Sequence, residues 1–165
     1  MCKLHLTRRQ SLTLIAAVPL FLSGCFEDGK TGPVDINWDR DSCTLCNMLI
    51  SDPRFAAQVR GGPKRKVFKF DDIGCAINWL NEQPWAGETE TEIWVADQSS
   101  TRQNVIWLKA RDARYLSGEL SPMNYGFAAY ANSSDPDSID FVKLTQNILA
   151  DSPNHICKVP HRSTS

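Results

Sequence analysis

A glycine-rich turn between two short apolar segments is the feature that most limits how this chain can fold. The segments are residues 55–60 and 66–70, and Gly61-Gly62-Pro63-Lys64 lies between them. Segments of this length, rich in aromatic and β-branched residues and joined by Gly and Pro, are typical of a β-hairpin. The sequence therefore predicts two neighbouring antiparallel strands.

A helix and a third strand are expected after this hairpin. Apolar residues recur at helical spacing over about 72–82, with Asp71 and Asp72 as N-cap candidates and Pro84 beyond the end. Residues 93–96 are apolar and are predicted to form a strand. The first half of the chain is thus predicted to be a β-β-α-β unit.

The second half resembles a weaker copy of the first. Phe127-Ala128-Ala129 follows Met123 much as Phe55-Ala56-Ala57 follows Met48. We expect further strands at 105–108, 139–144 and 156–159, and a short helix over 145–150. The sequence therefore predicts an α+β fold in which two β-β-α-β units, about 43–97 and 105–160, form one compact domain by internal duplication.

The N-terminus has the features of an export signal. Lys3, Arg8 and Arg9 precede an apolar stretch that is shorter than the roughly 20 residues of a membrane-spanning helix. This stretch ends in Leu22-Ser23-Gly24-Cys25, which is similar to the lipobox of bacterial lipoproteins. We expect removal of residues 1–24, lipidation of Cys25, a tether over 25–40 and a folded domain at 41–165.

Position 26 bears on which membrane would hold the lipid. Phe26 is not the Asp of an inner-membrane retention signal, which favours the periplasmic side of the outer membrane. The paired arginines Arg8 and Arg9 are compatible with export by either the Sec or the twin-arginine pathway.

The charge of the mature chain argues against a nucleic-acid partner. The formal net charge is -1 for the whole chain, and loss of Lys3, Arg8 and Arg9 takes it to -4. Phosphate binding needs clustered Lys and Arg, and no long basic run remains.

Three sulfur side chains, those of Cys43, Cys46 and Met48, fall within six positions. Thiolate and thioether are soft ligands that suit Cu(I) and disfavour Mg²⁺ or Ca²⁺. In an extended segment, residues two apart point to the same side, so Cys46 and Met48 can hold one ion. Cys43 joins them only if the two residues before Cys46 form a turn. Met123, at the equivalent point of the second half, would complete the site.

Other interpretations of the thiols stay open. A C-x-x-C pair also suits a membrane-anchored dithiol redox protein, although such pairs usually open a helix after a strand. A structural zinc site, a structural disulfide and a thiol-based metal-resistance protein are further alternatives. Cys75 is expected to be a packed residue, and His155 and Cys157 are weaker ligand candidates. No arrangement typical of catalysis is visible, which favours a binding protein over an enzyme.

The order of the motifs carries further information. A lipobox is followed by C-x-x-C-N-M-L-I at 43–50, Phe-Ala-Ala at 55–57, F-D-D-I-G-C at 70–75 and P-M-N-Y-G-F-A at 122–128. This ordered set resembles the NosL family, which has Gly where this chain has Asn47 and Asn124. Asn tolerates a left-handed backbone better than most residues, so the turn after Cys46 can be preserved.

The resemblance to the NosL family implies a metal carrier and not an enzyme. It implies Cu(I) binding in the periplasm and delivery of copper to the nitrous oxide reductase apoprotein. It also implies docking to an ABC-type Nos assembly complex in the inner membrane, and a homodimer remains open. The expected ligands are Cys46, Met48 and Met123, together with Cys43 if the turn forms.

Overall fold

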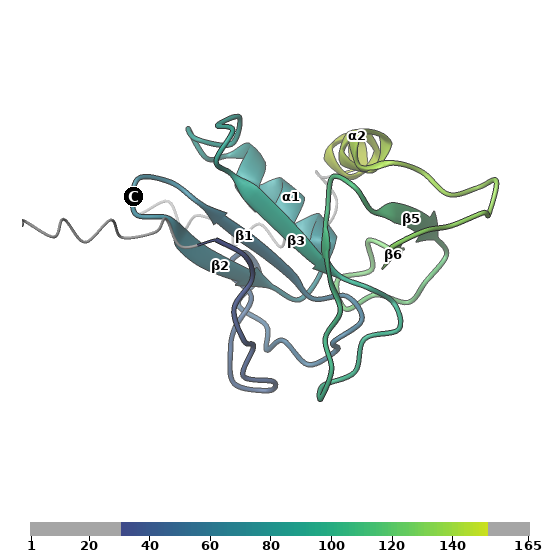
Figure 1. Cartoon of the computed structure of the whole chain (residues 1–165), viewed down its shortest axis with the longest axis horizontal. Coiled ribbons are helices and arrows are strands. Elements are labelled where there is room, and N and C mark those ends of the chain that lie inside the picture. Colours follow the sequence, from purple (N-terminus) through teal and green to yellow (C-terminus); the bar gives the residue numbers. More distant parts are fainter. Residues whose placement is uncertain (1–30, 152–165) are drawn as a thin grey trace, which may run out of the picture.

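A four-stranded antiparallel sheet forms the centre of the fold (Figure 1). The computed structural model describes residues 31–151. The strand order is β2-β1-β3-β4, and the strands are β1 (Ala57–Gly61), β2 (Lys66–Phe70), β3 (Glu92–Ala96) and β4 (Trp107–Lys109). The predicted hairpin and third strand are confirmed, and the strand expected at 105–108 is found slightly later.

Helix α1 (Ile73–Asn81) covers one face of this sheet and lies behind it in Figure 1. The carboxylate of Asp72 accepts a hydrogen bond from the Gly74 N–H at 2.9 Å, so the predicted N-cap is confirmed. Aromatic contacts of Trp79 with Phe68 and Phe70 tie the helix to β2. These contacts hold α1 against β2.

The opposite face of the sheet is covered by the N-terminal residues 31–36. The side-chain amide of Gln58 accepts from the Val34 N–H at 2.9 Å and donates to the Val34 carbonyl at 2.7 Å. The Arg60 side chain donates to the Gly32 carbonyl at 2.9 Å. Part of the predicted tether is therefore held against the sheet by hydrogen bonds to buried polar side chains.

A two-stranded sheet and a second helix make up the rest of the fold. They are β5 (Arg114–Ser117), β6 (Phe127–Tyr130) and α2 (Phe141–Asp151), and α2 packs against α1 and β5 (Figure 1). Strand β6 contains the Phe127-Ala128-Ala129 segment, which resembles the start of the first predicted strand, whereas β5 was not predicted. Within residues 31–151, neither helix is long and apolar enough to cross a membrane.

The strand predicted at 139–144 is wrong, because α2 begins at Phe141 and continues through the helix expected at 145–150. Phe141, Leu144 and Ile148 have helical spacing and are all buried, while the Val142 side chain between them is 65% exposed. The Asp140 carboxylate accepts from the Lys143 N–H at 2.8 Å and stabilises the first turn.

The structure supports the α+β class but does not show the predicted duplication. The described part of the second half contains β4, β5, β6 and α2, and the strand expected at 156–159 lies outside residues 31–151.

Candidate metal site

The C-x-x-C segment folds into a tight turn. The Cys43 N–H donates to the Met48 carbonyl at 2.8 Å, and the Asn47 N–H donates to the Cys43 carbonyl at 3.0 Å. Asn47 has a φ of 64°, the left-handed conformation that Asn adopts more easily than most residues. The Thr44 N–H binds the Lys69 carbonyl at 2.8 Å, which fastens the turn to β2. The condition for Cys43 to join Cys46 is therefore met.

This turn brings two thiols to a third thiol and a carboxylate. One ligand atom from each of Cys43, Cys46, Asp71 and Cys75 lies within 4.8 Å of all the others. Asp71 directly follows β2, and Cys75 lies in the first turn of α1. All three cysteines are free thiols. The four residues, called the thiol cluster below, could hold a metal ion.

Burial differs among the members of the thiol cluster. Cys43, Asp71 and Cys75 are at most 1% exposed, whereas Cys46 is only partly buried. The Cys46 thiol donates to the Asp71 carboxylate, with sulfur–oxygen distances of 3.5 and 3.6 Å. Cys46 is therefore the member through which an ion could enter or leave.

The three thiols differ in their acidity. A hydrogen bond from the Cys75 thiol, helped by the Cys46 and Asp71 N–H groups, lowers the pKa of Cys43 to about 7 against the effect of burial. Burial raises the pKa of Cys46 to about 12. The hydrogen bond to Cys43, and burial, raise the pKa of Cys75 far above its usual value. Cys43 is thus the thiol most easily available as a thiolate, the form that binds metals.

A buried carboxylate next to the cluster connects it to the second half of the chain. Asp72 accepts from the Ser121 hydroxyl at 2.5 Å and from the Met123 N–H at 3.4 Å. The Tyr125 ring packs so closely on Gly74 that a Cβ there would lie 2.1 Å from the ring. Residues 121–126 therefore lie against the start of α1.

The cluster includes residues that the sequence did not single out. Cys75 is packed in the core, as expected, but its sulfur also faces Cys43 and Cys46. Asp71 was expected only as a helix cap, and Asp72 has that role instead. The F-D-D-I-G-C segment contained both cluster residues, but sequence spacing alone does not place it beside the C-x-x-C turn.

The two predicted methionine ligands contact Cys46 and Asp72 through their backbone N–H groups. The Met48 N–H donates to the Cys46 thiol, and the Met48 side chain is 52% exposed. The Met123 side chain is partly buried against the core, and its N–H binds Asp72. Their roles as ligands remain predictions. His155 and Cys157 lie outside the described residues.

Comparison with models of known protein families shows to which family this chain belongs. The model of the NosL family matches residues 33–143, about two thirds of the sequence. The chain belongs to the NosL family. The matched region contains the C-x-x-C turn, the start of α1 and the Met123 loop, so the family resemblance that the motifs suggested is confirmed.

A solved structure of similar fold was also found. It is the crystal structure of the copper chaperone NosL from Shewanella denitrificans, with 16% sequence identity and a TM-score of 0.48. The similarity covers 74% of this chain and 87% of the other. Among curated proteins, no match was found.

Proposed function

We propose that this chain is a periplasmic carrier of Cu(I) and not an enzyme. Membership of the NosL family supports a role in supplying copper for the assembly of nitrous oxide reductase. The observation that carries the proposal is the thiol cluster, where three free thiols and a carboxylate converge within 4.8 Å.

The chemistry of the cluster favours Cu(I) over harder ions. Thiolates are soft ligands, and three of them around one point match the two or three ligands that Cu(I) accepts. A four-coordinate zinc site would need the Asp71 carboxylate as its fourth ligand, whereas Cu(I) needs only the three thiolates. The low pKa of Cys43 provides a first thiolate near neutral pH. Binding then displaces protons from the other two thiols.

The uneven burial of the cluster suits a carrier. Cys43 and Cys75 hold the ion from the buried side, and Cys46, whose thiol binds Asp71, is the partly exposed member of the cluster. A thiol or thioether of a partner can approach the metal at Cys46 and replace the ligands one at a time. Met48 and Leu49, both about half exposed, lie on the same turn and offer apolar contact to that partner.

The leader sequence supports the proposed location, and the family supports the proposed partners. The proposed anchor is a lipid on Cys25, on the periplasmic side of the outer membrane. The proposed recipients are the nitrous oxide reductase apoprotein and the Nos ABC-type assembly complex. Pairing into a homodimer remains compatible with this function.

A competition titration tests the proposal. The mature protein is titrated anaerobically with Cu(I) against a chromophoric Cu(I) chelator, and separately with Zn(II). We expect much tighter binding of Cu(I), a loss of at least about tenfold in Cys46→Ser, and no change in Ser42→Ala, which lies on the same turn outside the cluster. Equal or tighter Zn(II) binding would refute a Cu(I) carrier.

Because Cu(I) accepts only two or three ligands at a time, the methionines are proposed as alternative thioether ligands that can take the place of a thiolate. Met48→Leu and Met123→Leu should each weaken Cu(I) binding by about 1–3 kcal/mol. Leu49→Ala is the matched control, because Leu49 is as exposed as Met48 and has no sulfur. If either methionine variant behaves like Leu49→Ala, that residue is not a ligand.

The alternative of a dithiol redox protein makes a different prediction. Such a protein would catalyse thiol–disulfide exchange through Cys43 and Cys46 and would not need Cys75. An exchange assay with a disulfide-bonded substrate separates the two functions, since a Cu(I) carrier should show no turnover.

A further inference from the structure

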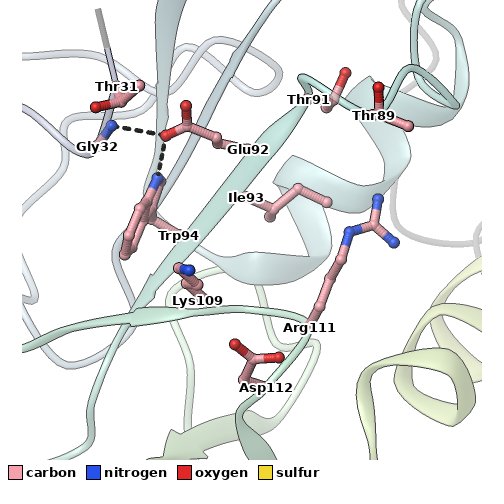
Figure 2. Close-up of a pocket in the computed structure, with 10 residues that line it drawn as sticks. All are labelled: Thr31, Gly32, Thr89, Thr91, Glu92, Ile93, Trp94, Lys109, Arg111 and Asp112. Carbon is pink, nitrogen blue, oxygen red and sulfur yellow. Dashed lines mark hydrogen bonds between the residues drawn. The ribbon is translucent and has the colours of Figure 1, made fainter.

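A groove with both polar and apolar lining lies along the start of β3, on the side of the sheet that carries Glu92 and Trp94 (Figure 2). Its volume is about 680 Å³. Lys109 and Arg111 border it together with the acidic Glu92 and Asp112 and the indole of Trp94. The groove is lined further by the hydroxyl-bearing residues Thr31, Thr89 and Thr91.

The Glu92 part of the groove and the thiol cluster lie toward opposite ends of the sheet. On β1, Arg60 pairs with Glu92 at the groove end, and Ala57 pairs with Phe70 at the end where Asp71 follows. Three residues of strand separate these ends, about 10 Å of backbone. Cys75 belongs to α1 on the other face of the sheet. A ligand in the groove would therefore leave the cluster accessible.

The chain enters the described fold at this groove. Thr31 and Gly32 line it, and the Gly32 N–H donates to the Glu92 carboxylate at 2.7 Å. Thr31 follows Cys25 by six positions, which allows a span of at most about 20 Å. A lipid on Cys25 would therefore keep this end of the fold close to the bilayer.

The side chains at the groove match the chemistry of a phospholipid surface. Lys109, Arg111 and Asp112 are exposed, and none of them forms an ion pair within residues 31–151. Arg111 lies over the Phe141 ring, 5.6 Å from its centroid. Cationic side chains pair with lipid phosphates. An acidic side chain pairs with the ammonium group of a zwitterionic lipid.

Trp94 adds a second signal for a membrane surface. Its indole is partly exposed and its N–H donates to Glu92 at 3.1 Å, so the ring is held at the rim of the groove (Figure 2). Tryptophan is enriched where membranes meet water, because its ring is apolar and its N–H is polar.

We propose that this groove is the membrane-facing surface of the protein and contacts phospholipid headgroups. The proposal rests on the proposed lipid anchor at Cys25. It assigns an orientation in which the start of β3 at Glu92 and the sheet face that carries Trp94 are turned to the bilayer, and the thiol cluster is turned to the periplasm. The lipid then fixes the distance to the membrane, and the groove determines which side of the domain faces outward.

Tryptophan quenching in vesicles tests this orientation. The lipidated mature protein is reconstituted into phosphatidylethanolamine–phosphatidylglycerol vesicles that contain lipids brominated near the headgroup. Trp94→Phe should lose roughly half or more of the quenching, since interfacial indoles contact these lipids. Trp38→Phe is the matched control, because Trp38 binds the Arg102 carbonyl in the loop after β3, at the cluster end. This variant should keep the quenching of the wild type.

A charge variant gives a second measurement. The double variant K109E/R111E should reduce quenching in the same vesicles without changing Cu(I) affinity. Equal quenching in Trp94→Phe and Trp38→Phe, or full quenching in the charge variant, would overturn the proposal. A mass spectrum showing no lipid on Cys25 would overturn the anchor and this orientation with it. Cu(I) binding by the same protein would still support the carrier function.

Discussion

The Cys46 thiol lies 3.6 and 3.5 Å from the two carboxylate oxygens of Asp71. This contact joins the C-x-x-C turn to the residue between β2 and α1. It also places a hard oxygen ligand among three soft sulfur ligands. The contribution of Asp71 to metal choice is therefore a sensitive test of the site.

Asp71→Asn should change the metal preference of the protein. A carboxylate is a useful ligand for Zn(II) but a poor one for Cu(I). We expect Zn(II) affinity to fall by about tenfold, or about 1.4 kcal/mol, with little change for Cu(I). Parallel titrations of both metals measure this. A comparable loss of Cu(I) affinity would make Asp71 a copper ligand.

Cys43 and Cys75 should matter as much as Cys46. The turn directs Cys43 into the cluster, and α1 brings Cys75 to the same point. Cys43→Ser and Cys75→Ser should each weaken Cu(I) binding by about tenfold or more, on the scale of one lost ligand. Circular dichroism controls for folding. Wild-type affinity in Cys75→Ser would reduce the site to a C-x-x-C dithiolate.

Gly74→Ala should destabilise the fold at the edge of the site. The new Cβ would lie 2.1 Å from the Tyr125 ring, so the loop that carries Met123 must move. Overpacking of this kind costs about 1–3 kcal/mol. Gly87→Ala is the control, since no atom lies within 4 Å of a Cβ there. Thermal unfolding compares the two, and equal midpoints would show that the Tyr125 contact is not tight.

The stability of the metal-free protein should depend on Asp72 in mildly acid solution. Burial raises the pKa of Asp72 from 3.8 to about 6. Between these values the folded chain binds more protons than the unfolded chain, so this contribution to stability is lost as pH rises, by up to about 3 kcal/mol. Asp72→Asn should remove this loss. Denaturant titrations at pH 4 and pH 7 measure it, and an unchanged pH dependence in the variant would contradict the assignment.

The local pattern of apolar and turn residues was sufficient to predict much of the first half of the fold. The glycine-rich turn predicted β1 and β2, and helical spacing with Asp72 as cap predicted α1. In the second half, Ile139 and its neighbours were predicted to form a strand because β-branched and aromatic residues are adjacent there. The helical spacing of Phe141, Leu144 and Ile148 is the better signal, since it matches the buried face of α2.

The candidate site could be predicted only in part, because it depends on contacts between distant segments. Cys43 and Cys46 were visible as a pair from their spacing. Cys75 is about thirty positions away, and contacts such as the hydrogen bond from the Thr44 N–H to the Lys69 carbonyl bring the C-x-x-C turn to the start of α1. No local pattern contains that contact, so the helical position of Cys75 suggested a packing role alone.

X-ray absorption at the copper edge of the Cu(I)-loaded protein tests the central claim most directly. We predict a first shell made only of sulfur, with thiolates from Cys43, Cys46 and Cys75, and a lower sulfur count in Cys75→Ser. A shell dominated by nitrogen or oxygen, or a spectrum unchanged by Cys75→Ser, would contradict a copper site built on these three thiols.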